Sequence, residues 1–166
     1  MSVGSPLAPA ALRWAWLSFD ELDGPALYAA LALRQAVFVV EQDCPYLDAD
    51  GLDDRSMHLL GWRGGDLAAY ARALPPGLVY PCAAIGRVVT SPAARGQGLG
   101  RPLMRRAMAH TWRRWGPGPI KLSAQAHLEP YYRSLGFAVC GPGYDEDGIP
   151  HLPMRCAGPP GNIPAE

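Results

Sequence analysis

The hexapeptide Arg95-Gly96-Gln97-Gly98-Leu99-Gly100 decides the fold of this chain, because it stands between a strand-like segment and a helix-like segment. The preceding run, residues 83–90 (AAIGRVVT), ends in β-branched residues. The following run, residues 99–115, carries apolar side chains at helical spacing. The first N–H groups of such a helix lack backbone partners and carry the positive end of the helix dipole. The turn therefore predicts a binding site for a diphosphate.

Two better-known phosphate loops do not match this turn. A Walker loop requires Gly, four spacers, Gly, Lys and Ser or Thr. A dinucleotide fingerprint requires Gly-x-Gly-x-x-Gly, but Leu103 stands where the third glycine is needed. The chain contains 19 glycines, so a chance glycine turn is the alternative and a second element is needed to decide.

That second element is residues 131–137 (YYRSLGF), which follow a predicted strand at residues 120–124. The loop and this element together resemble the GNAT superfamily of acyl-CoA-dependent N-acyltransferases. The pattern of that superfamily is Arg/Gln-x-x-Gly-x-Gly/Ala, a strand, and a short helix ending in Tyr-x-x-x-Gly-Phe. The resemblance covers roughly residues 14–155 and is strongest to ElaA-like proteins, through residues 34–42 (RQAVFVVEQ), 44–46 (CPY), 124–128 (AQAHL) and 147–151 (DGIPH).

Composition limits the classes of function. The 166 residues include 15 Lys and Arg and 15 Asp and Glu, and this balance argues against a nucleic-acid partner. Cys44, Cys82, Cys140 and Cys156 show no metal-ligand spacing, so no metal site is expected. No segment has the pattern of a signal peptide or a bilayer span, so we expect cytoplasmic residence without a membrane partner. The oligomeric state stays open.

The residue patterns predict an α+β fold with a mixed sheet of six or seven strands and helices on both faces, as the resemblance to a GNAT-like acyl-CoA N-acyltransferase also implies. Gly64-Gly65 predicts a tight hairpin. Residues 13–156 are expected to form one N-acetyltransferase domain, with disordered ends at 1–12 and 157–166. The expected strands are 14–19, 58–62, 66–73, 83–90, 120–124, 137–140 and 149–155, and the main helices begin at Pro25 and Leu99.

The resemblance implies acetyl-CoA as the acyl donor. It implies that the backbone of one strand pairs with the pantetheine arm, that an N–H at Val89 stabilises the oxyanion, and that the glycine loop holds the diphosphate. Gln125 stands where many relatives carry an Asn that contacts the cofactor. The residues assigned to the cofactor in this way are Arg87, Val88, Val89, Arg95, Gly96, Gln97, Gly98, Leu99, Gly100, Arg101 and Gln125.

The resemblance also assigns Tyr132, the tyrosine before x-x-x-Gly-Phe, as the general acid that protonates the leaving thiolate. Relatives commonly place a Glu on a central strand to deprotonate the amine, but residues 85–90 and 120–124 contain no carboxylate. The general base therefore stays open among Glu41, His127 and His151. The residues expected around the acceptor are Arg34, Phe38, Glu41 and Gln42.

The acidic segment at residues 48–54 (DADGLDD) has some features of a calcium loop. With Gly51 as the sixth position, however, Tyr46 and Met57 would occupy positions that require carboxylates. We interpret the segment as a solvated turn. The alternative is an acidic rim, shared with residues 145–147, for a cationic amine.

The sequence therefore predicts an acetyl-CoA-dependent N-acetyltransferase in which an amine of unidentified kind attacks the thioester directly. A covalent route through cysteine is disfavoured, since no neighbouring sequence would lower a thiol pKa. The alternative is a non-catalytic acyl-CoA-binding sensor or a partner-binding module that keeps the cofactor loop. Tyr132 favours catalysis, whereas the missing strand carboxylate favours the alternative.

Overall fold

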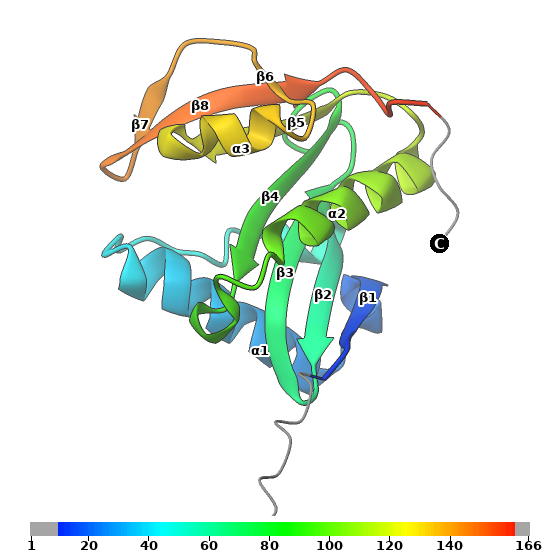
Figure 1. The fold of residues 1–166 in the computed structure, drawn as a ribbon, viewed down its shortest axis with the longest axis vertical. Coiled ribbons are helices and arrows are strands. Elements are labelled where there is room, and N and C mark those ends of the chain that lie inside the picture. The colour runs from blue at the N-terminus through cyan, green and yellow to red at the C-terminus, as the bar shows by residue number, and fades with distance from the viewer. Residues whose placement is uncertain (1–9, 162–166) are drawn as a thin grey trace, which may run out of the picture.

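The computed structural model describes residues 10–161 and has one mixed sheet with helices on both sides (Figure 1). Of the ends predicted to be disordered, 1–12 and 157–166, residues 1–9 and 162–166 lie outside the described residues, and Leu12 is the first residue of β1. The strands are β1 (Leu12–Ser18), β2 (Met57–Arg63), β3 (Asp66–Leu74), β4 (Ala83–Thr90), β5 (Ile120–Gln125), β6 (Ala138–Val139), β7 (Tyr144–Glu146) and β8 (Ile149–Cys156). The α+β class and the mixed sheet agree with the prediction.

The eight strands run in the order β1-β2-β3-β4-β5-β8-β6, with β7 paired to β8. Strands β1 to β4 are antiparallel, β4 and β5 are parallel, and β5 and β8 are antiparallel. Gly64 and Gly65 form the expected tight turn, with Arg63 opposite Asp66 and Gly64 at φ +60°. The short β7 has no predicted counterpart, because its three residues are all exposed and carry no apolar alternation.

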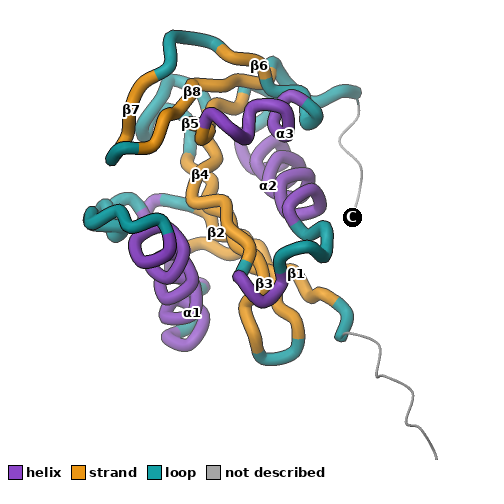
Figure 2. Tube along the Cα trace, turned by 60° about the vertical axis from the view of Figure 1, so that its left-hand side comes forward, coloured by secondary structure: helices purple, strands orange, loops and turns teal. Residues whose placement is uncertain are grey.

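Helices α1 (Gly24–Arg34) and α2 (Gly100–Trp115) cover opposite faces of the sheet (Figure 2). Alternation along β3 produces a core on each face: Ala71 packs in the cluster with α2 and Tyr70 packs in the cluster with α1. The short α3 (Glu129–Arg133) joins the α2 side through Tyr132. Within the described residues, no helix is long and apolar enough to cross a membrane.

The end of α1 changes its winding where the sequence becomes rich in β-branched residues. The helix begins at a side-chain cap, since Asp23 Oδ1 accepts from the Ala26 N–H at 2.8 Å. After Arg34 the chain continues as a π-helical segment, η2 (Gln35–Glu41). The Gln42 N–H donates to the Val37 carbonyl, five residues earlier. Wider turns of this kind rotate the following side chains relative to an α-helix.

Strand β4 carries a β-bulge. Arg72 of β3 lies opposite Gly86 and Tyr70 lies opposite Val89, so two residues of β4 face one residue of β3. Arg87, the first residue of the bulge, has a positive φ of +48°. β4 separates from β5 before the bulge: only Ala83 and Ala84 pair with β5, and the two strands then diverge (Figure 1).

Candidate active site

The divergence of β4 and β5 opens a cavity of about 640 Å³. Its walls come from β4 on one side and β5 with α3 on the other, and the end of η2 and the β7–β8 turn close it. The predicted site residues that line it are Phe38, Glu41, Gln42, Arg87, Val88, Val89, Arg95, Gln125, His127, Tyr132 and His151. The fold therefore brings together all four catalytic candidates.

The edge of β4 that faces this cavity carries unpaired peptide groups, because no residue after Ala84 pairs with β5. The Ser91 N–H donates to the Ala68 carbonyl at 2.8 Å. Since donors alternate along a strand and Val89 lies opposite Tyr70, regular alternation would direct the Val89 N–H to β3 as well. Val88 lies in the bulge, where the alternation of donors is interrupted, so the oxyanion donor at Val89 stays a prediction.

The glycine loop continues from Arg95, at the cavity wall, into α2. Gly96 and Gly98 have φ values of +76° and +71°, a conformation that favours glycine. The first bond of the helix runs from the Leu103 N–H to the Leu99 carbonyl, which leaves the preceding N–H groups without helical partners. A Cβ on Gly100 would lie 3.2 Å from the Tyr131 hydroxyl, so glycine permits α3 to approach α2.

Side chains of the loop are held by the protein itself. Gln97 accepts a hydrogen bond from Arg63, and Leu99 is buried beside Ala94. Arg101 donates to Ser134 Oγ at 2.9 Å. None of the residues from Gly96 to Arg101 lines the cavity, so the backbone N–H groups at the start of α2 lie beyond the cavity wall at Arg95.

Tyr132 combines burial with access to the cavity. Only 7% of the residue is exposed, and its ring packs edge-on against Phe137. Burial raises the pKa of the Tyr132 phenol far above its usual value. Among the described residues, nothing forms a hydrogen bond with the Tyr132 hydroxyl. A phenol with such a pKa keeps its proton at neutral pH and acts as a donor.

Two contacts cross the cavity from the end of η2. Glu41 Oε1 pairs with Arg95 Nη1 at 2.8 Å, and both side chains are nearly half exposed. Gln125 Nε2 donates to Gln42 Oε1 at 3.2 Å. The first contact reaches the glycine loop and the second reaches β5. The end of η2 therefore touches both walls.

The two histidines differ in how firmly they are held. His151 Nδ1 donates to the Ile149 carbonyl at 2.7 Å, and its Nε2 lies 3.5 Å from Glu146 Oε2. Its ring stacks on Tyr144. His127 is exposed at the cavity rim. The carbonyl fixes the proton on His151 Nδ1, and only Nε2 is left to exchange protons.

Arg34, which was expected to contact the acceptor, lies outside the cavity lining. It is 1% exposed, and its Nε donates to Asp48 Oδ2 at 2.9 Å. The other oxygen of Asp48 accepts from Arg87 Nε at 2.9 Å. Asp48 thus joins the end of α1 to the β4 bulge. The interpretation of residues 48–54 as a solvated turn is wrong for Asp48, because its side chain is 3% exposed and pairs with two arginines.

Asp50 and Asp53 of the same segment pair with Arg72, which is buried in the middle of β3. Partial burial raises the pKa of Asp50, but the hydrogen bond and charge of Arg72 outweigh it and lower that pKa to about 2. Burial lowers the pKa of His58, whose ring lies between the Tyr70 hydroxyl and the Asp53 carbonyl. Sequence reasoning missed this network, although an arginine inside an apolar strand signals a buried carboxylate partner.

These features define a class: a mixed sheet split between two parallel strands, with a glycine turn into a helix at the split. The model for the acetyltransferase (GNAT) domain family matches residues 47–157. The chain belongs to the GNAT acetyltransferase family, and both its fold and its family support an N-acyltransferase.

Within that family the chain is ElaA-like. Protein ElaA of Escherichia coli K12 is 45% identical over 145 residues, which cover 86% of this chain and 95% of ElaA. The crystal structure of Escherichia coli ElaA aligns with a TM-score of 0.82 over 88% of this chain and 99% of that one, at 44% identity. An acyl-CoA N-acyltransferase from Pseudomonas aeruginosa aligns with a TM-score of 0.86 at 50% identity, over 89% of this chain and 100% of that one.

We expect Asp48→Asn to reduce the free energy of unfolding by about 3–5 kcal/mol, because it leaves two partly or fully buried guanidinium groups without their shared carboxylate. Urea unfolding followed by circular dichroism measures this change. Asp54→Asn is the matched control, since Asp54 pairs with Arg55 at 3.8 Å and both side chains are exposed. The control should change stability by less than about 0.5 kcal/mol. Equal effects of the two substitutions would contradict the central role of Asp48.

Proposed function

We propose that this protein is an acetyl-CoA-dependent N-acetyltransferase that transfers the acetyl group to an amine by direct attack on the thioester. The observation that carries the proposal is the unpaired edge of β4 beyond Ala84, which faces the cavity and leads to the glycine turn. An extended ligand with amide groups can complete such an edge as a neighbouring strand would. The pantetheine arm of CoA has this chemistry.

The rest of the donor would follow the edge of β4 from the cavity to the glycine turn. The diphosphate would lie at the turn into α2, where free N–H groups and the helix dipole favour an anion. Arg95 offers a charge-assisted contact at the point where the turn meets the cavity. Gln125 would reach the pantetheine arm from β5, because its amide already points across the cavity to Gln42.

In the proposed reaction the amine nitrogen forms a bond to the thioester carbonyl carbon and the carbon–sulfur bond breaks. A backbone N–H of β4, at Val88 or Val89, would stabilise the oxyanion of the tetrahedral intermediate. Tyr132 would give its proton to the departing thiolate and recover one from solvent. Glu41 would accept the proton of the amine. No metal or covalent enzyme intermediate is required.

Glu41 is our choice for the base because of its contact with Arg95. Arg95 lies beside the proposed diphosphate site, so the bound donor would compete with Glu41 for this guanidinium. The carboxylate would then be free to accept a proton when the donor is in place. His127 and His151 line the same cavity and are the alternatives. Donor binding without thiol release from a panel of amines would instead favour the non-catalytic sensor.

We expect Gly98→Asp to weaken acetyl-CoA binding about tenfold or more, because it places a carboxylate beside the diphosphate in a left-handed conformation. Isothermal titration calorimetry measures the affinity. Gly77→Asp is the control, since Gly77 also has a positive φ of +86° but lies in the β3–β4 connection. An unchanged affinity in folded Gly98→Asp would refute the proposed diphosphate site.

We expect Tyr132→Phe to lower kcat about a hundredfold to ten-thousandfold while acetyl-CoA still binds, because it removes a positioned proton donor and keeps the ring. Thiol release at saturating donor measures the rate. Tyr131→Phe is the control and should leave kcat within about twofold, since its hydroxyl is buried beside Gly100 and outside the cavity lining. Full activity of Tyr132→Phe, with chemistry limiting the rate, would assign the acid to another group.

We expect Glu41→Gln to lower kcat by about a hundredfold or more and to leave acetyl-CoA affinity equal or higher, because it removes both the base and the competitor for Arg95. Kinetics and calorimetry on one preparation separate the two effects. Glu129→Gln, which breaks an i,i+4 pair with Arg133 outside the cavity, should change neither quantity. If Glu41→Gln retains full activity, the base is one of the histidines.

A further inference from the structure

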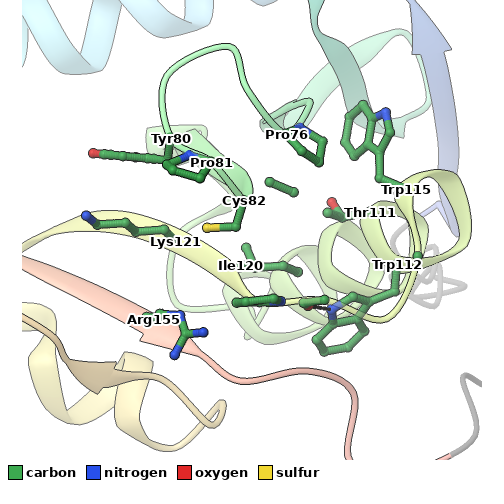
Figure 3. Close-up of a pocket in the computed structure, with 14 residues that line it drawn as sticks. Pro76, Tyr80, Pro81, Cys82, Thr111, Trp112, Trp115, Ile120, Lys121 and Arg155 are labelled. Carbon is green, nitrogen blue, oxygen red and sulfur yellow. Dashed lines mark hydrogen bonds between the residues drawn. The ribbon is translucent and has the colours of Figure 1, made fainter.

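A second cavity, of about 580 Å³, lies at the C-terminal end of α2, beside the paired start of β4 and β5 (Figure 3). We call it the α2 cavity. Trp112 and Trp115 of α2 and Pro76 and Pro81 of the β3–β4 connection contribute apolar groups to its lining. Its volume is in the range of sites that hold small organic ligands.

Two cations stand at one side of the α2 cavity. Lys121 of β5 lies directly opposite Arg155 of β8 in the antiparallel register. Like charges in directly opposed positions repel each other. The Lys121 ammonium lies 4.3 Å from the centroid of the Tyr80 ring, and within residues 10–161 neither cation forms an ion pair with a carboxylate. None of the described lining residues is Asp or Glu.

A buried polar atom also belongs to the wall. Thr111 is 1% exposed, and its Oγ1 has no hydrogen-bond partner. In Figure 3 its side chain points toward the cavity beside Trp115. An unpaired buried hydroxyl is unfavourable, and a ligand atom within hydrogen-bond reach would supply the missing partner.

We propose that the α2 cavity binds a small organic anion whose flat apolar body lies against Trp115 and the two prolines and whose carboxylate lies between Lys121 and Arg155. The aromatic wall would pack against the flat apolar part of the ligand, and Lys121 and Arg155 would form charge-assisted hydrogen bonds with its carboxylate. Binding would relieve the repulsion across β5 and β8. This inference stands independently of the proposed acetyl transfer.

The α2 cavity is distinct from the candidate active site but shares one residue with it. Tyr80 lines both cavities, and its ring carries the contact with Lys121. In Figure 3 the ring is seen beside Pro81, with the hydroxyl directed away from Trp115. An anion that draws Lys121 toward Arg155 would therefore change the surroundings of a residue in the wall of the active-site cavity.

The test uses the full chain saturated with CoA, so that a probe cannot enter the proposed cofactor cleft. Titration with 2-naphthoate, followed by ¹⁵N–¹H correlation NMR, should shift the Trp115 indole N–H and the amides of Thr111 and Lys121. The neutral analogue 2-naphthamide should bind about tenfold more weakly or worse, because it lacks the charge that the two cations bind. Equal binding of the two probes, or shifts confined to residues outside the α2 cavity, would overturn the proposal.

We expect Lys121→Met to weaken 2-naphthoate binding about tenfold, because it removes one charge-assisted contact and keeps the length of the side chain. Arg105→Met, on an exposed part of α2 outside the cavity lining, is the control and should leave the affinity unchanged. Thr111→Val tests the hydroxyl without changing the packing volume. If Lys121→Met binds as well as Arg105→Met, the cations do not hold the ligand and the proposal is wrong.

Discussion

The Asp48 carboxylate forms the two ion pairs on which the arrangement of the candidate active site depends. One oxygen binds Arg34 at the end of α1 and the other binds Arg87 in the β4 bulge, and both distances are 2.9 Å. Its backbone carbonyl accepts from the same two arginines. A buried carboxylate is tolerated only when its charge and its lone pairs are satisfied. Asp48 therefore fixes the position of the bulge relative to the segment that closes the cavity.

The pairing between β4 and β5 ends at Ala84, before the bulge at Arg87, and the residues of β4 that follow border the cavity. A sheet that is otherwise continuous thus leaves one strand position unfilled at its centre. Because unpaired peptide groups in a partly buried cleft are costly, the fold gains stability from any extended ligand that completes the sheet.

Local sequence signals predicted the parts of the fold that short-range chemistry determines. The glycine turn, α2 and the Gly64-Gly65 hairpin follow from spacing and from residues that adopt positive φ. The role of Asp48 could not be predicted in this way, because its partner Arg87 is 39 residues away and no local pattern links the two. The direction of the Val89 N–H also depends on the bulge, which shifts the register of β4 by one residue. Arg72 was the available signal, since a cation within the apolar run of β3 requires a buried anion nearby.

The placement of charge around the active-site cavity has one further implication. Arg72 and Arg87 are already neutralised by Asp48, Asp50 and Asp53, so they hold structure and offer little charge to a ligand. Arg95, in the wall of the same cavity, forms an exposed pair with Glu41. A solvent-exposed pair of this kind is worth only about 0–1 kcal/mol, so a multivalent anion at the glycine turn can displace the carboxylate at small cost. The chain thus keeps its buried ion pairs beneath the bulge and places a weak, exposed pair at the glycine turn.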